Sequence, residues 1–489
     1  MKRFPIARRR KMWYNYYVYG SGCLAAHFFA KDANDLHKEN TSLLQGSIWK
    51  GMTAFALPIL LGQIFQQLYN TADALIVGRY LSDAEYAAVT STGSLVFLLV
   101  GFFGGISVGA GVVIARYFGA KDENKLRISV HTTVFFGIAA GLFLTVFGIL
   151  FTPWMLKVMG TPLEIMPYSV LYFRFYFAGA LGIVLYNLCM GILRAVGDST
   201  HPLYYLIISS IVNIVLDLLF VGVLRWGVWS AALATAIAQM ISVLLCMYRL
   251  FHYQTSYQLK LRQLRADFPM LREVIHYGLP SGVQNSIIAF ANVIVQTNIN
   301  SFGQDTVAGS GTYAKLEGFA FLPITCFAMA LTTFVSQNLG AKQHERAKKG
   351  TRFGILCCVV MAELIGVALL VLAEPLMGCF TDNEEAIKIG AQQARVEALF
   401  FCMLSFSHCI AAILRGAGKP MVPMFVMLGT WCAIRVAYIS ILVPIVKESW
   451  VIFSAYPVTW TLSSIIFFVY YLKSDWLHAF DRKEARQTT

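Results

Sequence analysis

The stretches Gly119-Ala120-Lys121 and Ile192-Leu193-Arg194-Ala195-Val196-Gly197 decide the fold, because both return 221 residues further along the chain. Their second copies are Gly340-Ala341-Lys342 and Ile413-Leu414-Arg415-Gly416-Ala417-Gly418. Around them lie twelve apolar segments in two sets of six, and about 20 apolar residues are enough to cross a bilayer as a helix. The sequence therefore predicts an all-α integral membrane protein with twelve transmembrane helices in two six-helix repeats.

The composition excludes a water-soluble globule. Hydrophobic residues make up 57% of the 489 residues and charged residues 13%, whereas about a quarter of an ordinary soluble domain is charged. The predicted spans are 49–77, 87–114, 128–151, 167–193, 203–224 and 228–250 in the first repeat, and 272–301, 306–335, 352–374, 389–413, 421–445 and 451–472 in the second.

An even number of crossings returns the chain to the face on which it started, so the repeats are expected to be parallel and related by an axis along the membrane normal. Two such units facing one another leave a central cleft that can open to either side, as in transporters. The expected domains are a cytoplasmic N-terminal tail (1–46), an N-terminal six-helix lobe (47–252), a cytoplasmic amphipathic linker (253–270), a C-terminal six-helix lobe (271–474) and a cytoplasmic tail (475–489).

The net charge of +13 is distributed as in a membrane protein, which argues against a nucleic-acid partner. Lys and Arg collect in the N-terminal segment, the even-numbered connections and the C-terminal tail, while the odd-numbered connections hold five. Because positive residues favour the cytoplasmic side, we expect both termini there, in a multi-pass protein of the cell membrane. Lys260, Arg262 and Arg265 lie among leucines, which suits an amphipathic linker helix on anionic lipid headgroups.

The repeated Gly-Ala-Lys stretches fall between the second and third helices of each lobe. Their glycines are expected to allow a tight turn, and their lysines to anchor at the headgroups. The N-terminal segment 1–46 is too interrupted to predict a signal or a thirteenth span, so we expect a tail on the inner leaflet.

Two aspartates lie inside predicted spans, where an ionisable group is expensive unless it serves a function. Asp73 lies near the outer end of the first span, and Asp217 lies in the fifth. Asn213 is four residues before Asp217, so both share one helical face, and Thr235 in the sixth span adds a hydroxyl to the same lobe. These four residues form the candidate ion-coupling site.

Two carboxylates close together in a low dielectric cannot both stay charged and unpaired, so the site is expected to hold a proton or a sodium ion near neutral pH. The alternative interpretation is a polar cluster that only holds helices together. In the second repeat the positions equivalent to Asn213, Asp217 and Thr235 carry apolar or aromatic residues, which are Ile434, Tyr438 and Tyr456. The scaffold is repeated and this chemistry is not.

The second lobe carries charges of its own, at Lys315 and Glu317 in the eighth span and Arg435 in the eleventh. Lys315 and Glu317 are two residues apart and point to different faces, so each needs a partner elsewhere. Glu317 with Arg435 is one candidate pair. The three residues belong either to a structural ion-pair network or to the substrate path.

Pro58 and Pro280 interrupt the first helix of each lobe, where each removes a backbone hydrogen bond and permits a bend. Both are hinge candidates. The two interpretations are a fixed kink in each lobe and a bend at Pro58 that changes when Asp73 takes up a proton and so narrows the cavity.

Several motifs are absent from the sequence: a phosphate-binding loop, His-Glu-x-x-His, a potassium-filter run and Cys-x-x-Cys. Transport is therefore expected to draw on an ion gradient, without a cofactor, a resident metal or enzymatic activity. The motif set thus favours a secondary transporter.

With these residues in hand, the chain resembles the multidrug and toxic compound extrusion family, in its DinF-like branch. The resemblance covers about residues 46–475. It rests on Leu57-Pro58, on Asn70-Thr71-Ala72-Asp73-Ala74-Leu75-Ile76-Val77-Gly78, on Gln337-Asn338-Leu339-Gly340-Ala341 and on the two Ile-Leu-Arg-x-x-Gly stretches.

The resemblance implies a V-shaped pair of six-helix lobes that exports amphipathic, often cationic compounds against protons or sodium. It also implies that Asp73, Asn213, Asp217 and Thr235 are the ion site. Another branch places an acidic residue in the seventh helix, but Gln284-Asn285-Ser286 bring no charge there, which argues against a cation site in the second lobe.

We therefore expect a proton- or sodium-coupled multidrug exporter that acts as a monomer on small amphipathic substrates among membrane lipids. One alternative is a flippase for lipid-linked saccharides, which needs a strongly cationic cavity for pyrophosphate; only Lys315 and Arg435 are available by sequence. The alternative of another class is an integral membrane enzyme, for which only scattered histidines, His131, His201 and His408, are present.

Overall fold

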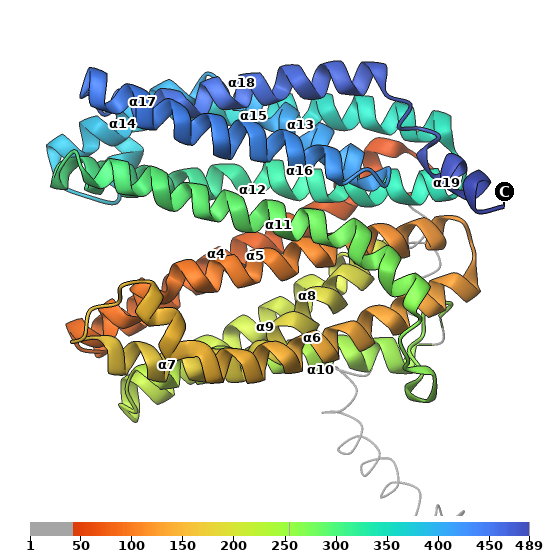
Figure 1. Cartoon of the computed structure of the whole chain (residues 1–489), viewed down its shortest axis with the longest axis horizontal. Coiled ribbons are helices and arrows are strands. Elements are labelled where there is room, and N and C mark those ends of the chain that lie inside the picture. The colour runs from red at the N-terminus through yellow and green to blue at the C-terminus, as the bar shows by residue number, and fades with distance from the viewer. Residues whose placement is uncertain (1–42, 254, 489) are drawn as a thin grey trace, which may run out of the picture.

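The computed structural model describes residues 43–253 and 255–488, which form helices and connections with no strand among them. The first lobe holds α4 (Ile48–Tyr80), α5 (Asp83–Gly119), α6 (Glu123–Val158), α7 (Met166–Ala178), α8 (Ala180–Ala195), α9 (Thr200–Asp217), the π-helix η1 (Leu218–Val223) and α10 (Val228–His252). The second holds α11 (Phe268–Asn300), α12 (Gln304–Gly340), α13 (His344–Gly378), α14 (Glu384–Ala398), α15 (Phe401–Gly416), α16 (Met421–Met427), the π-helix η3 (Leu428–Ile434), α17 (Arg435–Val446) and α18 (Trp450–Lys473). A 3-10 turn η2 (Leu261–Gln263) lies in the linker, and α19 (Ala479–Thr488) lies at the C-terminal end (Figure 1).

The membrane spans fall where the apolar segments predict them. Within the described residues, ten helices are long and apolar enough to cross a bilayer. Two bent pairs, α7 with α8 at 45° and α14 with α15 at 56°, bring the number to twelve if each pair is one span. The all-α membrane architecture is therefore confirmed. The bend itself was not predicted, and it occurs in the fourth span of both lobes.

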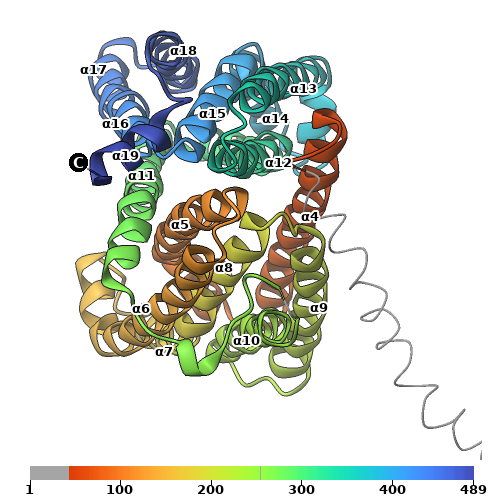
Figure 2. The ribbon, with the colours of Figure 1, turned by 90° about the vertical axis from the view of Figure 1, so that its right-hand side faces the viewer.

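The first helix of each lobe begins against the opposite lobe, and the end-on view shows α4 and α11 at the two sides of the molecule (Figure 2). A Cβ at Gly354 of α13 would lie 3.3 Å from Cε of Met52, whereas one at Gly62 would lie 3.5 Å from Leu206 of α9. Helix α4 thus leaves the second lobe for the first between Met52 and Gly62. It stays one continuous helix across this interval, which contains Pro58.

Helix α11 makes the reverse crossing. Glu273, in its second turn, pairs with Arg116 of α5 at 3.0 Å, while Val295 and Ile299 near its other end pack with Ile439 of α17. Like α4, it continues through its proline, Pro280. The two hinge candidates therefore lie in helices that both connect the lobes.

The lobes touch closely at the end that carries Gly119 and Gly340. Neither glycine has room for a Cβ, because Gly119 meets the backbone of Gln337 and Gly340 meets that of Arg116. The Oγ of Ser336 donates to the carbonyl of Val112 at 2.7 Å. Gln337 donates to the carbonyl of Ala195 at 2.8 Å. We call this set of contacts, together with the Arg116–Glu273 pair, the interlobe seal.

The two Gly-Ala-Lys stretches turn differently from the expectation. The left-handed residue in each turn is the lysine, with φ of 56° at Lys121 and 57° at Lys342. The glycines are helical, and the space they save lets α5 and α12 cross. The repeated stretch thus belongs to the interlobe seal as well as to a turn.

The linker expectation needs a correction. Instead of an amphipathic helix, the described residues of the linker form an extended strap with one 3-10 turn at Leu261–Gln263. The N–H of Lys260 donates to Nε2 of His131 at 2.9 Å, and the N–H of Asp267 donates to the hydroxyl of Thr132 at 3.3 Å. Contacts with α6 outweigh the local helical pattern here. The prediction for residues 1–42 lies outside the described residues.

Candidate functional site: an acidic pocket and an interlobe cleft

The fold brings Asp73 and Asp217 together. Asp73 projects from α4 and Asp217 is the last residue of α9, and the two carboxyl groups lie within hydrogen-bonding reach of each other. Asp217 is fully buried, and Asn213 one turn earlier is 2% exposed. We call Asp73, Asn213 and Asp217 the acidic pocket.

Most polar atoms of the acidic pocket have no protein partner. Within the described residues, no hydrogen-bond donor reaches either carboxylate oxygen of Asp217 or Oδ1 of Asp73, and the amide of Asn213 is also unpaired. Two carboxylates cannot share a buried site unless a proton or a cation lies between them. The geometry therefore suits an exchangeable small cation.

Two tyrosines that the sequence did not single out surround the acids. The hydroxyls of Tyr69 and Tyr172 interact electrostatically with both Asp73 and Asp217, and the ring of Tyr172 lies 6.4 Å from that of Tyr176. Tyr69 is four residues before Asp73, so a search of the same helical face would have found it. Tyr172 lies on α7, and no spacing relates it to the acids.

Thr235 is not joined to the acidic pocket by a hydrogen bond among the described residues. It lies on α10, which packs against α9, and its side chain is half-buried. Of the four predicted site residues, the structure thus brings Asp73 and Asp217 into contact, with Asn213 on the same face as Asp217.

The backbone changes geometry directly beside the acidic pocket. The π-helix η1 begins at Leu218, immediately after Asp217, and η3 ends immediately before Arg435 in the second lobe. Short π-helical turns inside α-helices are frequent at functional sites, because they shift the side-chain register of the helix. Nothing in the composition of these segments predicted them.

In the second lobe, Glu317 and Arg435 line one cavity of 550 Å³ that opens toward the other lobe. They interact electrostatically but form no ion pair within 4 Å. The Arg435 guanidinium instead donates to the hydroxyl of Thr459 at 2.9 Å and lies 4.2 Å from the ring centre of Tyr456. Lys315 is exposed and does not line this cavity, so the structure separates it from the other two.

Glu397 is a buried acid that was not among the residues predicted from the sequence. Its carboxylate accepts from the hydroxyl of Tyr313 at 3.0 Å and from the amide of Gln393 at 2.9 Å, and Ser310 donates to Gln393 in turn. The side chain is fully buried. Its presence inside the predicted span 389–413 was the available signal.

Two cavities lie between the lobes. One of 290 Å³ is lined by Arg194 of α8 and Arg415 of α15, and it shares Asn285, Met329 and Arg415 with the cavity of Glu317 and Arg435. Together they form the interlobe cleft. Both arginines belong to the repeated Ile-Leu-Arg stretches, and both line this cleft, so the expectation that only Lys315 and Arg435 are available as cations is wrong.

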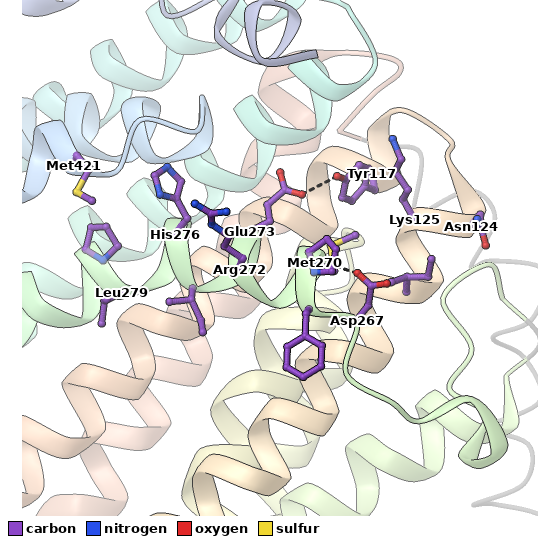
Figure 3. Close-up of a pocket in the computed structure, with 15 residues that line it drawn as sticks. Tyr117, Asn124, Lys125, Asp267, Met270, Arg272, Glu273, His276, Leu279 and Met421 are labelled. Carbon is purple, nitrogen blue, oxygen red and sulfur yellow. Dashed lines mark hydrogen bonds between the residues drawn. The ribbon is translucent and has the colours of Figure 1, made fainter. Parts of the chain in front are cut away.

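A further cavity, of 1180 Å³, lies elsewhere, beside the first turns of α11 and the connection between α5 and α6. Figure 3 shows Glu273 reaching the hydroxyl of Tyr117, at 2.8 Å, and Asp267 capping the N–H of Met270, at 2.9 Å. Glu273 of the interlobe seal lines this cavity. Neither Asp73 nor Asp217 lines this 1180 Å³ cavity.

Comparisons with known proteins agree with this architecture. The MatE family model matches residues 58–219 and again 280–439. The chain is 27% identical over 433 residues to a probable multidrug resistance protein, YoeA, of Bacillus subtilis, covering 87% of this chain and 94% of that protein. It is 24% identical to the probable multidrug resistance protein NorM of Thermotoga maritima, covering 81% and 86%.

Solved structures share the fold. A MATE transporter in its bent conformation superposes with a TM-score of 0.84 at 22% identity, covering 91% of this chain and 99% of that one. A MOP superfamily transporter from Pyrococcus furiosus superposes with a TM-score of 0.82 at 23% identity, covering 88% and 97%. Because the family model matches both halves and most of the chain, this multi-pass membrane protein belongs to the MatE family of transporters.

Proposed function

We propose that the protein is a secondary active multidrug exporter of the cytoplasmic membrane, with both termini in the cytoplasm, that exchanges small amphipathic compounds for protons or sodium. The observation that carries this proposal is the pairing of half-buried Asp73 with fully buried Asp217, in which both oxygens of Asp217 and Oδ1 of Asp73 lack protein donors among the described residues. The names of the relatives support export of drugs: several are called multidrug resistance or export proteins. Another relative, 24% identical, is called an FAD transporter.

The chain's own residues provide a way to link ion and substrate. An empty acidic pocket leaves two facing carboxylates that repel each other, and an incoming cation removes that repulsion. Asp73 lies on the same continuous helix as Met52, which packs against the second lobe. A shift of α4 at Asp73 is therefore transmitted to the surface on which the two lobes meet.

The interlobe seal supplies the second element of alternating access. It closes the end with Gly119 and Gly340, which would face the cytoplasm if the positive residues of the connections lie on that side. The substrate would lie in the interlobe cleft. Opening to the cytoplasm requires breaking the Arg116–Glu273 pair and separating α5 from α11 and α12.

The test is efflux from proteoliposomes with proton and sodium gradients imposed separately. Asp217→Asn removes one of the two facing charges and is expected to abolish gradient-driven efflux in both regimes. Asp83→Asn, at the exposed first turn of α5, is the matched control and should transport like the parent. Unchanged efflux in Asp217→Asn contradicts the proposal.

A further inference from the structure

Arg194 and Arg415 are the same residue of the two repeats, and they meet in one cavity. Each follows the Ile-Leu pair of its repeated stretch, on α8 and α15 respectively, and both line the 290 Å³ cavity between the lobes. Pseudo-symmetry thus places two arginines, one from each lobe, in the lining of a single cavity.

Neither guanidinium has an acidic partner among residues 43–253 and 255–488. The Nε of each is buried without a hydrogen-bond acceptor. The sulfur of Met329 is 4.0 Å from Arg194, and the charged or polar groups that influence Arg194 are Tyr186 and two cysteines, with no carboxylate. No carboxylate acts on Arg415 either.

Other arginines of the same molecule show what a satisfied guanidinium looks like here. Arg116 pairs with Glu273 at 3.0 Å, and Arg249 pairs with Asp198 at 2.9 Å. Arginine stays charged in proteins, and an uncompensated charge within the membrane is costly. Two such charges that line one cavity therefore favour the binding of an anionic ligand there.

The residues that line the interlobe cleft indicate the chemistry of the rest of the ligand. Around the arginines the cavity is lined by neutral polar groups, among them Gln63, Asn187 and Thr332. The adjoining 550 Å³ cavity is aromatic, with Trp431, Tyr456 and Trp460. The two cavities share residues, and their sizes fall in the range of about 300–1,000 Å³ typical of ligand pockets.

The residues that line the interlobe cleft carry a net positive charge. Three arginines line the two cavities, namely Arg194, Arg415 and Arg435, against one acid, Glu317. Glu317 lies beside Arg435 and interacts with it. The positive excess therefore stays at Arg194 and Arg415.

We propose that Arg194 and Arg415 bind the anionic group, a carboxylate or a phosphate, of an amphipathic substrate whose aromatic or apolar body lies against Trp431 and Tyr456. This deepens the proposed export function by naming the substrate class, and it replaces the expectation of mainly cationic compounds. Because the anion contacts one arginine from each lobe, it also bridges the two halves across the cleft.

The test compares two dyes that share a xanthene ring system, anionic fluorescein and cationic rhodamine 6G, by equilibrium binding to purified parent and variant proteins. Arg194→Gln and Arg415→Gln should each weaken fluorescein binding by about tenfold or more, since each removes a charged hydrogen-bond donor to the anion. Rhodamine 6G binding should stay the same or improve. Arg→Lys at either position should restore part of the fluorescein affinity.

Arg225→Gln, at an exposed arginine before α10, is the matched control and should bind both dyes like the parent. Equal loss of both dyes in the arginine variants, or unchanged fluorescein binding in the double variant, overturns the proposal. Thermal melting of each variant identifies a protein that has unfolded, and the Arg→Lys variants then decide the outcome.

A second arm separates a free anion from a lipid headgroup. Dodecyl phosphate that displaces fluorescein only from proteins with both arginines assigns the site to phosphorylated lipids, whereas no displacement assigns it to soluble aromatic anions. Both results retain the anion site. Binding needs no ion gradient, so failure here is distinguishable from failure of Asp217→Asn in transport.

Discussion

The two lobes bury carboxylates in opposite ways. In the first, Asp217 is fully buried and neither of its oxygens has a hydrogen-bond donor among the described residues. In the second, Glu397 is equally buried, but Tyr313 and Gln393 occupy its two oxygens. The difference teaches that the duplication preserved the helical scaffold without preserving how a buried acid is paired, since Glu397 has protein donors and Asp217 has none among the described residues.

The largest effect is expected from substitution of Asp73, which tests whether the first lobe needs both of its facing carboxylates. Asp73→Asn leaves a single carboxylate in the acidic pocket, so no second charge demands a cation, and efflux driven by either gradient should fall to that of protein-free liposomes. The measurement is dye efflux at matched protein incorporation. Retained efflux would show that the facing pair is not the coupling site.

The second largest effect concerns an ion pair that the second lobe lacks. Asp198 pairs with Arg249 at 2.9 Å and with His201 at 3.0 Å, whereas the equivalent positions hold Lys419 over the ring of Tyr470, 5.8 Å away. Breaking a buried pair costs about 3–5 kcal/mol. Asp198→Asn should lower the free energy of unfolding by about that amount in denaturant titrations.

The matched variant in the second lobe is Lys419→Gln. It removes a partly exposed cation–π contact, worth about 0.5–1 kcal/mol, and the hydrogen bond from Nζ to the carbonyl of Asp475 at 3.2 Å, worth about 0.5–1.5 kcal/mol. The unfolding free energy should therefore fall by at most about 2.5 kcal/mol. Equal losses in the two variants would contradict the contrast between the lobes.

The Asp198 pair also has a pH signature. Burial acts to raise the pKa of Asp198, but the hydrogen bond from His201 and the charge of Arg249 outweigh it, so the pKa lies below its ordinary value. A lowered folded-state pKa stabilises the protein above the unfolded pKa of about 3.9, and this contribution is lost as pH falls through the folded value. The stability gap between parent and Asp198→Asn should therefore be constant from pH 6 to 8 and narrow below about pH 4.

A smaller effect is expected from substitution of Glu397, the paired acid of the second lobe. Glu397→Gln keeps the size of the side chain but turns one acceptor into a donor that faces Tyr313 or Gln393, which should cost about 1–3 kcal/mol of unfolding free energy. Gradient-driven efflux per folded molecule should stay within about twofold of the parent. Loss of efflux with intact stability would give the second lobe a coupling role.

The smallest effect is expected at the tyrosine beside the acids. Tyr69→Phe removes a hydroxyl but leaves both carboxylates, so the concentration of driving ion needed for half-maximal efflux should shift by about threefold or less. Maximal efflux should not change. Abolished efflux would place the hydroxyl of Tyr69 among the ion's direct ligands.

Periodicity and composition predicted the spans well because lipid forces each apolar segment into a helix. The acidic pair was also predictable, since a charged residue in a predicted span is rare enough to single out. Thr235 was included because its hydroxyl lies in the sixth span of the same lobe, and the structure shows no hydrogen bond between it and the acids within the described residues.

Contacts between segments that are distant in the chain could not be predicted from the sequence. The linker pattern around Arg262 favoured a helix, but bonding to His131 and Thr132 holds it extended. Arg194 and Arg415 were visible as a repeat, yet their convergence on one cavity depends on how the lobes face each other. Tyr172 reached the acids through the packing of α7, which no local pattern encodes.

The exchange of first helices between the lobes has a consequence for biosynthesis. The carbonyl of Leu43 accepts from Asn338 and Arg346, and Met52 rests on α13, yet those partners are translated almost 300 residues later. The start of α4 must therefore wait in the membrane until the distal half of the polypeptide has been inserted. A nascent first half released on its own would lack the surface that completes it.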